Sequence, residues 1–252
     1  MKASANKILE YILVPVLIFI SFTLIYHLGI FNKLIFPDPL RIIAEFIRLF
    51  SNVEILDDFA FTFLRVITAL AISTLIGIPI GLILGYFERA YKMLEFAIDF
   101  FRSIPAVALF PLFLLFFGIG DISKILLSVW ATTFIIIVNS SYGVKHATKV
   151  HIKMAKVYST SSRYLFKDII FPGAMPHIFS GVRIGASISL ILVVVTEMFM
   201  GSVNGLGHAI IDAQLKYEIP EMYAIIILTG IFGYLLNKVL LVIEKRKIHW
   251  IR

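Results

Sequence analysis

The sequence predicts an all-α membrane protein, a bundle of six transmembrane helices with both termini in the cytoplasm. Of the 252 residues, 60% are hydrophobic and only 15% are charged, whereas a soluble domain is about half apolar and about a quarter charged. The apolar residues gather in six runs, each long enough to cross a bilayer, which takes about 20 helical residues. Lysine and arginine gather in alternate connections between these runs.

The six apolar runs are predicted to be helices, because backbone groups left unpaired in lipid are too costly. The sequence lacks the alternating segments of about ten residues that a membrane barrel needs. The first run is about twenty residues long, which exceeds the roughly 7–15 of a signal-peptide core. A retained first helix is therefore expected rather than a cleaved signal. The runs lie at about 11–30, 59–87, 93–117, 122–143, 178–200 and 222–243.

The orientation follows from the basic residues, which favour cytoplasmic loops. With the N-terminus inside, the inner segments carry fourteen lysines and arginines and the outer segments carry five. The largest inner group, six basic residues, lies between Lys145 and Lys167. The net charge of +7 is therefore interpreted as a marker of cytoplasmic loops in a plasma-membrane protein, not as a nucleic-acid-binding surface.

The segment 31–58 contains a predicted amphipathic helix, which follows Pro37-Asp38-Pro39. We expect it to lie at the outer membrane interface. The chain is accordingly divided into 1–58, the first transmembrane helix with this external segment, and 59–248, a domain of five further helices. The apolar residues at helical spacing are Leu40, Ile43, Phe46, Ile47 and Phe50.

Small residues and prolines predict where helices pack closely and where they break. Glycines recur every four residues in "GIPIGLILG" (77–85), and again at Gly181 and Gly185. Such spacing favours close helix contact in membranes, either within the bundle or with a second copy of the chain. Pro79 and Pro105 are expected to kink or interrupt their helices.

A few charged residues within the apolar runs are candidate functional groups. Glu197 costs about 2.5–3.5 kcal/mol at the centre of a bilayer, so an intramembrane carboxylate is a functional candidate by default. The alternative is a carboxylate that reaches the interface or pairs with a nearby polar group. Arg65 and Arg183 are expected to snorkel from the ends of their helices. Arg102 adjoins the break at Pro105 and could face a cavity there.

The sequence contains none of the motifs for enzyme or cofactor chemistry that we sought. A phosphate-binding loop, a His-Glu-x-x-His pair and a Gly-x-Ser-x-Gly turn are all missing. The six histidines are scattered and cysteine is absent, so we expect no metal, no cofactor and no catalytic residue. Two classes fit such a chain: a transport subunit driven by a separate ATPase, or a self-contained secondary carrier or channel.

The basic stretch "KMAKVYSTSSRYLFKDIIFPGAMP" (153–176) favours the first class. It resembles the cytoplasmic motif of ABC importer permeases, which is Glu-Ala-Ala, three residues, Gly, nine residues and Ile-x-Leu-Pro. The spacing agrees throughout, and four of the motif residues are replaced. The matching positions are Lys153, Met154, Ala155, Ser159, Ile169, Phe171 and Pro172.

Further stretches are similar to the nitrate, sulfonate and taurine group of these permeases, among them 102–125, 171–199 and "GLGHAI" (205–210). The resemblance implies a type I importer fold. It also implies that a coupling segment at 150–172 docks on a cytoplasmic ATP-binding subunit. It also implies an extracytoplasmic solute-binding protein and pairing with a second, identical copy. The substrate would be a small solute such as nitrate, a sulfonate or taurine. Candidates for the pathway or gate are Glu197, Arg102, Pro105 and Asn204.

Overall fold

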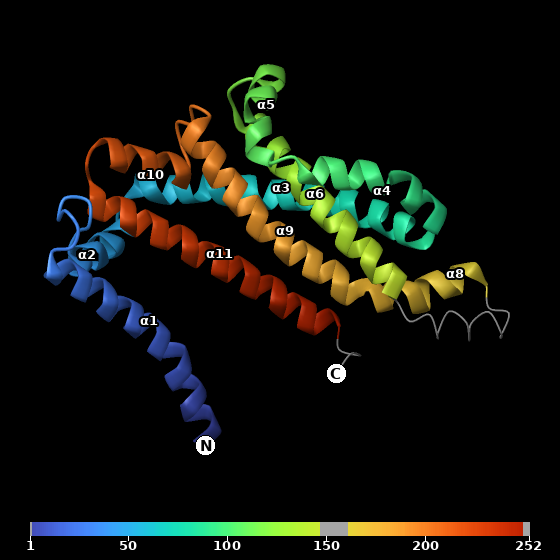
Figure 1. The fold of residues 1–252 in the computed structure, drawn as a ribbon, viewed down its shortest axis with the longest axis horizontal. Coiled ribbons are helices and arrows are strands. Elements are labelled where there is room, and N and C mark those ends of the chain that lie inside the picture. The colour runs from blue at the N-terminus through green and yellow to red at the C-terminus, as the bar shows by residue number, and fades with distance from the viewer. Residues whose placement is uncertain (1, 147–160, 249–252) are drawn as a thin grey trace.

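The computed structural model describes residues 2–146 and 161–248 (Figure 1). Lys153, Met154, Ala155 and Ser159 of the expected coupling motif lie outside the described residues. Within these two ranges the protein is helical and has no strand. The helices are α1 (Lys2–Leu28), α2 (Pro39–Leu49), α3 (Val53–Tyr86), α4 (Glu88–Ser103), the 3-10 helix η1 (Ala106–Leu109), α5 (Phe110–Phe117), α6 (Asp121–His146), α8 (Ser162–Tyr164), the π-helix η2 (Leu165–Ile170), α9 (Phe171–Phe199), α10 (Leu206–Leu215) and α11 (Ile219–Lys247).

The structure confirms the predicted all-α class and the presence of several helices that could span a membrane. Among the described residues, four helices are long and apolar enough to cross a membrane: α3, α6, α9 together with η2, and α11. The pair α4 and α5, bent by 81°, would make a fifth as one broken span. The apolar part of α1, Leu13–Leu28, is shorter than the 18 residues required of a spanning helix. The structure therefore supports four or five spans, and the sixth stays a prediction.

Glycines let α3, α6 and α9 approach one another closely. A Cβ atom added at Gly81 would lie 2.6 Å from the carbonyl oxygen of Ile137 on α6. One added at Gly181 on α9 would lie 2.6 Å from Cβ of Asn139, also on α6. Both sets of glycines thus face α6 of the same chain. Of the two interpretations of their spacing, packing within the bundle is the one that the structure shows.

The two prolines expected to disturb helices behave differently. Helix α4 ends at Ser103, and Ile104 before Pro105 is extended, with φ −72° and ψ 121°. A residue that precedes proline disfavours the helical conformation, so the chain turns sharply before η1 and α5. Helix α3, in contrast, continues through Pro79 to Tyr86. The expected interruption therefore occurs at Pro105 and not at Pro79.

The predicted amphipathic helix after Pro37 is α2. The side chain of Asp38 caps it by accepting a hydrogen bond from the Leu40 amide at 2.9 Å. Leu49 packs in a buried cluster with residues of α10 and α11, while Leu40 and Ile47 stay exposed. Figure 1 shows α2 and α10 at one end of the bundle, called here the α10 end, and α8 at the other, the α8 end.

Candidate functional site

A buried arginine organises the α10 end of the bundle. Arg65 lies in α3 and is 3% exposed. Its Nη1 is 2.7 Å from Oε1 of Glu197 in α9 and donates to the Asn204 carbonyl oxygen at 3.0 Å. Its Nη2 lies 2.7 Å from Oδ1 of Asp121, the first residue of α6, and also donates to Oδ1 of Asn204. We call Thr62, Arg65, Asp121, Glu197 and Asn204 the Arg65 network.

Glu197 is the most enclosed carboxylate of this network, at 1% exposure. Besides Arg65, it accepts a hydrogen bond from the Thr62 hydroxyl at 2.9 Å and one from the Gly207 amide at 3.0 Å. A Cβ atom at Gly205 would lie 2.4 Å from Cδ of Glu197, so only glycine fits there. A buried charge is tolerated when its hydrogen bonds are satisfied, and here three groups surround it.

Side chains of α3 and α6 in the same region bind the α9–α10 loop, residues 200–205, and the start of α10. The Lys124 ammonium donates to the Ser202 hydroxyl. Asp58 accepts a hydrogen bond from the Gly205 amide at 2.6 Å. The Thr62 hydroxyl accepts one from the Leu206 amide at 2.8 Å, at the first residue of α10. Helices α3 and α6 are thereby tied by polar contacts to the loop and to the start of α10.

The structure brings together two of the four predicted pathway residues, Glu197 and Asn204, and both contact Arg65. Arg102 instead pairs with Asp99 on its own helix at 3.1 Å, and Pro105 precedes η1 at the bend. No hydrogen bond or ion pair within 2–146 and 161–248 joins Arg102 to the Arg65 network.

The expectation that Arg65 snorkels to the interface is wrong. Glu197 inside the bundle and the half-exposed Asp121 at the start of α6 supply opposite charges, so the guanidinium stays buried between them. Arg183 is partly exposed and lies 3.1 Å from Glu244 of α11, so it too pairs with a carboxylate. For Glu197, pairing with a nearby polar group was one of the two alternatives, and the structure shows such pairing.

Sequence reasoning missed Thr62, Asp58, Asp121 and Lys124 as parts of this region. Lys124 is only 3% exposed, although it lies at the start of the run 122–143 and was counted with the basic residues of the outer segments. A signal was available for the centre of the network. One apolar run holds a single arginine and another a single carboxylate, and charged groups inside membrane bundles pair with one another.

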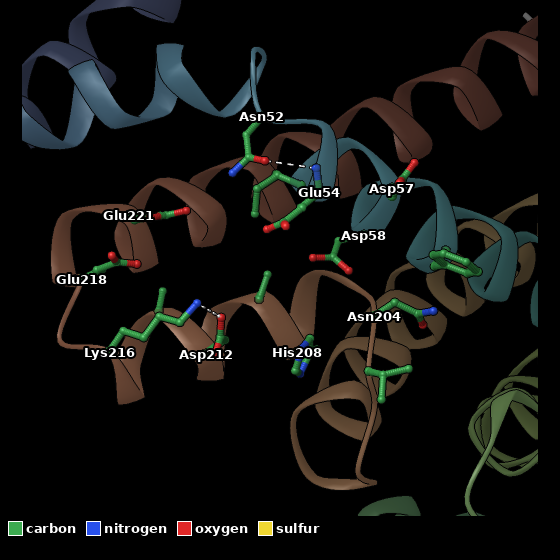
Figure 2. Close-up of a pocket in the computed structure, with 15 residues that line it drawn as sticks. Asn52, Glu54, Asp57, Asp58, Asn204, His208, Asp212, Lys216, Glu218 and Glu221 are labelled. Atoms are coloured by element: carbon green, nitrogen blue, oxygen red, sulfur yellow. Dashed lines mark hydrogen bonds and ion pairs between the residues drawn. The ribbon is translucent and has the colours of Figure 1, made fainter.

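An acidic cavity of about 380 Å³ opens beside the network, between the start of α3, α10 and the start of α11. Figure 2 shows Asn204 and Glu218 at opposite ends of it. Lys216 lies 2.6 Å from Asp212, and this hydrogen bond raises the pKa of Lys216. Asn204 belongs to both the cavity wall and the Arg65 network. The carboxylates that line the cavity are Glu54, Asp57, Asp58, Asp212, Glu218 and Glu221.

A second hollow lies beside the break at Pro105 and is apolar. It has a volume of about 350 Å³, and no charged residue lines it. Its walls come from η1, α5, α6 and α9. The hollow therefore offers no charge pair or hydrogen-bonding cluster for a tightly held anion. Its lining residues are Val107, Phe110, Leu127, Val195, Thr196 and Phe199.

At the α8 end, the three described residues of the predicted coupling motif lie where η2 passes into α9. Ile169 is partly buried in η2, Phe171 is 37% exposed, and Pro172 lies in the first turn of α9. The π-helix η2 runs directly into α9. Pro172 falls in the first turn of α9, a position where proline is tolerated.

Comparison with known proteins gives a family and a fold. The family model for the binding-protein-dependent transport system inner membrane component matches residues 77–247. A permease named for aliphatic sulfonate transport in Bacillus subtilis is 27% identical over 95% of this chain and 86% of its own. The taurine transport system permease of Escherichia coli is 28% identical over 88% of this chain and 82% of its own.

Among solved structures, a chain of the MetNI methionine ABC transporter in an inward-facing conformation has a similar fold. The TM-score is 0.64 at 18% sequence identity, covering 74% of this chain and 92% of that chain. At this identity the similarity shows the fold alone.

Proposed function

Because the chain belongs to the family of binding-protein-dependent transport system inner membrane components, we propose that it is the permease subunit of an ABC import complex. It forms the translocation pathway for a small solute and couples to a separate cytoplasmic ATP-binding subunit. It is a transport subunit, and ATP hydrolysis belongs to the partner chain. The relatives named for sulfonates and taurine favour a small anion of the nitrate, sulfonate or taurine type.

The family match over 77–247 is the observation that carries this proposal, since it spans the bundle from the second half of α3 to the end of α11. The broken pair α4 and α5, with the apolar hollow beside Pro105, is the proposed wall of the pathway. Non-helical backbone at membrane depth is tolerated where it lines a cavity. Glu197 and Asn204 belong to the proposed outer gate, and Arg102 to the pathway at the bend.

The proposed arrangement in the plasma membrane has six spans, with α1 as the first and both termini in the cytoplasm. The α8 end then faces the cytoplasm, and the α10 end faces the solute-binding protein outside. Residues 1–58 form a peripheral unit and 59–248 the transport domain. A second, identical copy completes the pathway. The basic residues of the segment 145–167 support this orientation.

The proposed coupling element is the segment 150–172. Its motif residues Ile169, Phe171 and Pro172 lie at the root of α9. Since η2 and α9 form one continuous helical run from Leu165 to Phe199, a displacement of this root by the ATPase would pass directly along α9. That run reaches Glu197 at the opposite end of the bundle.

Reconstitution into lipid vesicles tests the proposal. Uptake of a sulfonate or taurine is expected only with the ATP-binding subunit, ATP and the solute-binding protein together. Deletion of 153–165 is expected to abolish ATPase association while the helices still insert. Full uptake without any ATPase would contradict the proposal and support a self-contained carrier.

A further inference from the structure

Residues 201–205 of the α9–α10 loop are held to the bundle by polar contacts rather than by apolar packing. Met200, the first residue of the loop, and Leu206, directly after the loop, are fully buried. Between them the one large apolar side chain is Val203, which is 86% exposed. The contacts that position residues 202–205 are those from Lys124, Arg65 and Asp58 described above.

The acceptors around Arg65 differ in strength, and the loop contributes the weakest. Asp121 and Glu197 are carboxylates, whereas Asn204 offers only a neutral carbonyl oxygen and a neutral amide oxygen. The two carboxylates attract the guanidinium by their full charge as well as by hydrogen bonding, whereas the two oxygens of Asn204 offer hydrogen bonding alone. Arg65 can therefore release Asn204 while it remains paired with Glu197, which avoids leaving a buried charge uncompensated.

Two glycines flank the part of the loop that Arg65 holds. Gly201 has φ +59° and Gly205 has φ +113°, values that glycine adopts at little cost. Hinges in proteins are a few loop positions that take up a change in φ and ψ. The loop therefore has backbone positions that can turn at both of its ends, with Asn204 between them.

We propose that Arg65 is the positioning residue of a latch that holds the α9–α10 loop against α3, α6 and α9. The latch opens when Asn204 leaves the guanidinium, while Glu197 and Asp121 stay paired with it. Its assignment to the outer gate rests on the proposed function, whereas the latch itself does not. Because Asn204 also lines the acidic cavity, opening of the latch changes the shape of that cavity.

Hydrogen exchange of the full chain in lipid nanodiscs tests the latch directly. The amides of Gly205, Leu206 and Gly207 donate to Asp58, Thr62 and Glu197, so they report whether the loop is closed. Arg65→Gln is expected to speed exchange in a peptide covering these amides by about tenfold or more, which corresponds to about 1.4 kcal/mol.

The matched control is Arg183→Gln, which removes the partly exposed pair with Glu244 on another part of α9. It is expected to leave exchange at 205–207 unchanged. The segment 77–86 of α3 is the internal reference, since it packs on α6 through glycines. Unchanged exchange at 205–207 in Arg65→Gln would overturn the proposal. An equal increase at 77–86 would also overturn it, because it would show general loosening instead of a latch.

Asn204→Ala provides a second variant in case Arg65→Gln does not fold. It removes one contact of the guanidinium and leaves the Arg65–Glu197 pair intact. The same local increase at 205–207 is expected, and its absence would contradict the latch. Uptake by the wild-type complex is measured separately. An absence of uptake by the wild-type complex would contradict the proposed function. The latch would still be tested by the hydrogen-exchange result alone.

Discussion

The two halves of helix α3 contact their neighbours by different means. Near its start, Thr62 and Arg65 bind α6, α9 and the α9–α10 loop through hydrogen bonds and ion pairs, of which those to Glu197 are buried. From Gly77 onwards, the same helix packs its backbone against α6 with no room for a side chain. Hydrogen-bonded contacts can change partners one at a time, whereas close glycine packing is lost only when the helices separate. Movement is therefore expected at the α10 end, and rigidity in the α3–α6 contact.

The largest effect on stability is expected when the first half of α3 loses the Arg65 guanidinium. Arg65→Ala leaves Glu197 buried without a counter-ion, which costs about 3–5 kcal/mol. Thermal unfolding of the detergent-solubilised protein measures the loss. As a control, Arg48→Ala removes an exposed arginine 3.5 Å from Glu45 and is expected to cost about 0–1 kcal/mol.

The double variant Arg65→Leu with Glu197→Leu sharpens that result. It is expected to be more stable than either single variant, because it leaves neither of the two charges buried and unpaired. If the single variants instead add up fully in the double variant, the ion pair is not the source of the stability at this end of α3.

A smaller effect is expected in the packed half of α3. Gly81→Ala places a Cβ atom 2.6 Å from the Ile137 carbonyl oxygen, so α3 and α6 must separate, at a cost of about 1–3 kcal/mol. Gly230→Ala is the matched control, since nothing lies within 4 Å of a Cβ atom there. The same unfolding assay applies. Equal stability of the two variants would refute the close α3–α6 contact.

The sequence was enough to predict the packed half of α3 but not the polar half. Glycine spacing along one helix is a local signal, and it correctly marked 77–85 as a contact surface. The Arg65 network depends on which helices become neighbours, so Asp121 gave no local sign that it pairs with Arg65. For the same reason Lys124 gave no local sign of its burial. Arg65 was misjudged for the same reason, because snorkelling is the better option for an arginine without a partner.

The helix boundaries teach a related lesson about apolar runs. The fifth run was expected at 178–200, but the helical stretch begins at Leu165, well before the hydrophobic residues dominate. Hydropathy marks the part of a helix that suits lipid, whereas the helix continues as long as its backbone hydrogen bonds do. The bend at Pro105 was predictable, because proline acts on the residue directly before it.

The smallest effect is expected at an ion pair that resembles the Arg65–Glu197 pair in distance but not in burial. Lys216 lies 2.6 Å from Asp212 on the wall of the acidic cavity, and their side chains are 59% and 44% exposed. Water screens such a pair, and many exposed pairs contribute nothing measurable. Lys216→Ala is therefore expected to leave the unfolding temperature unchanged at both low and high salt. A loss comparable to that of Arg65→Ala would mean that charge pairing at the α10 end, and not the burial of Glu197, sets the stability of that end.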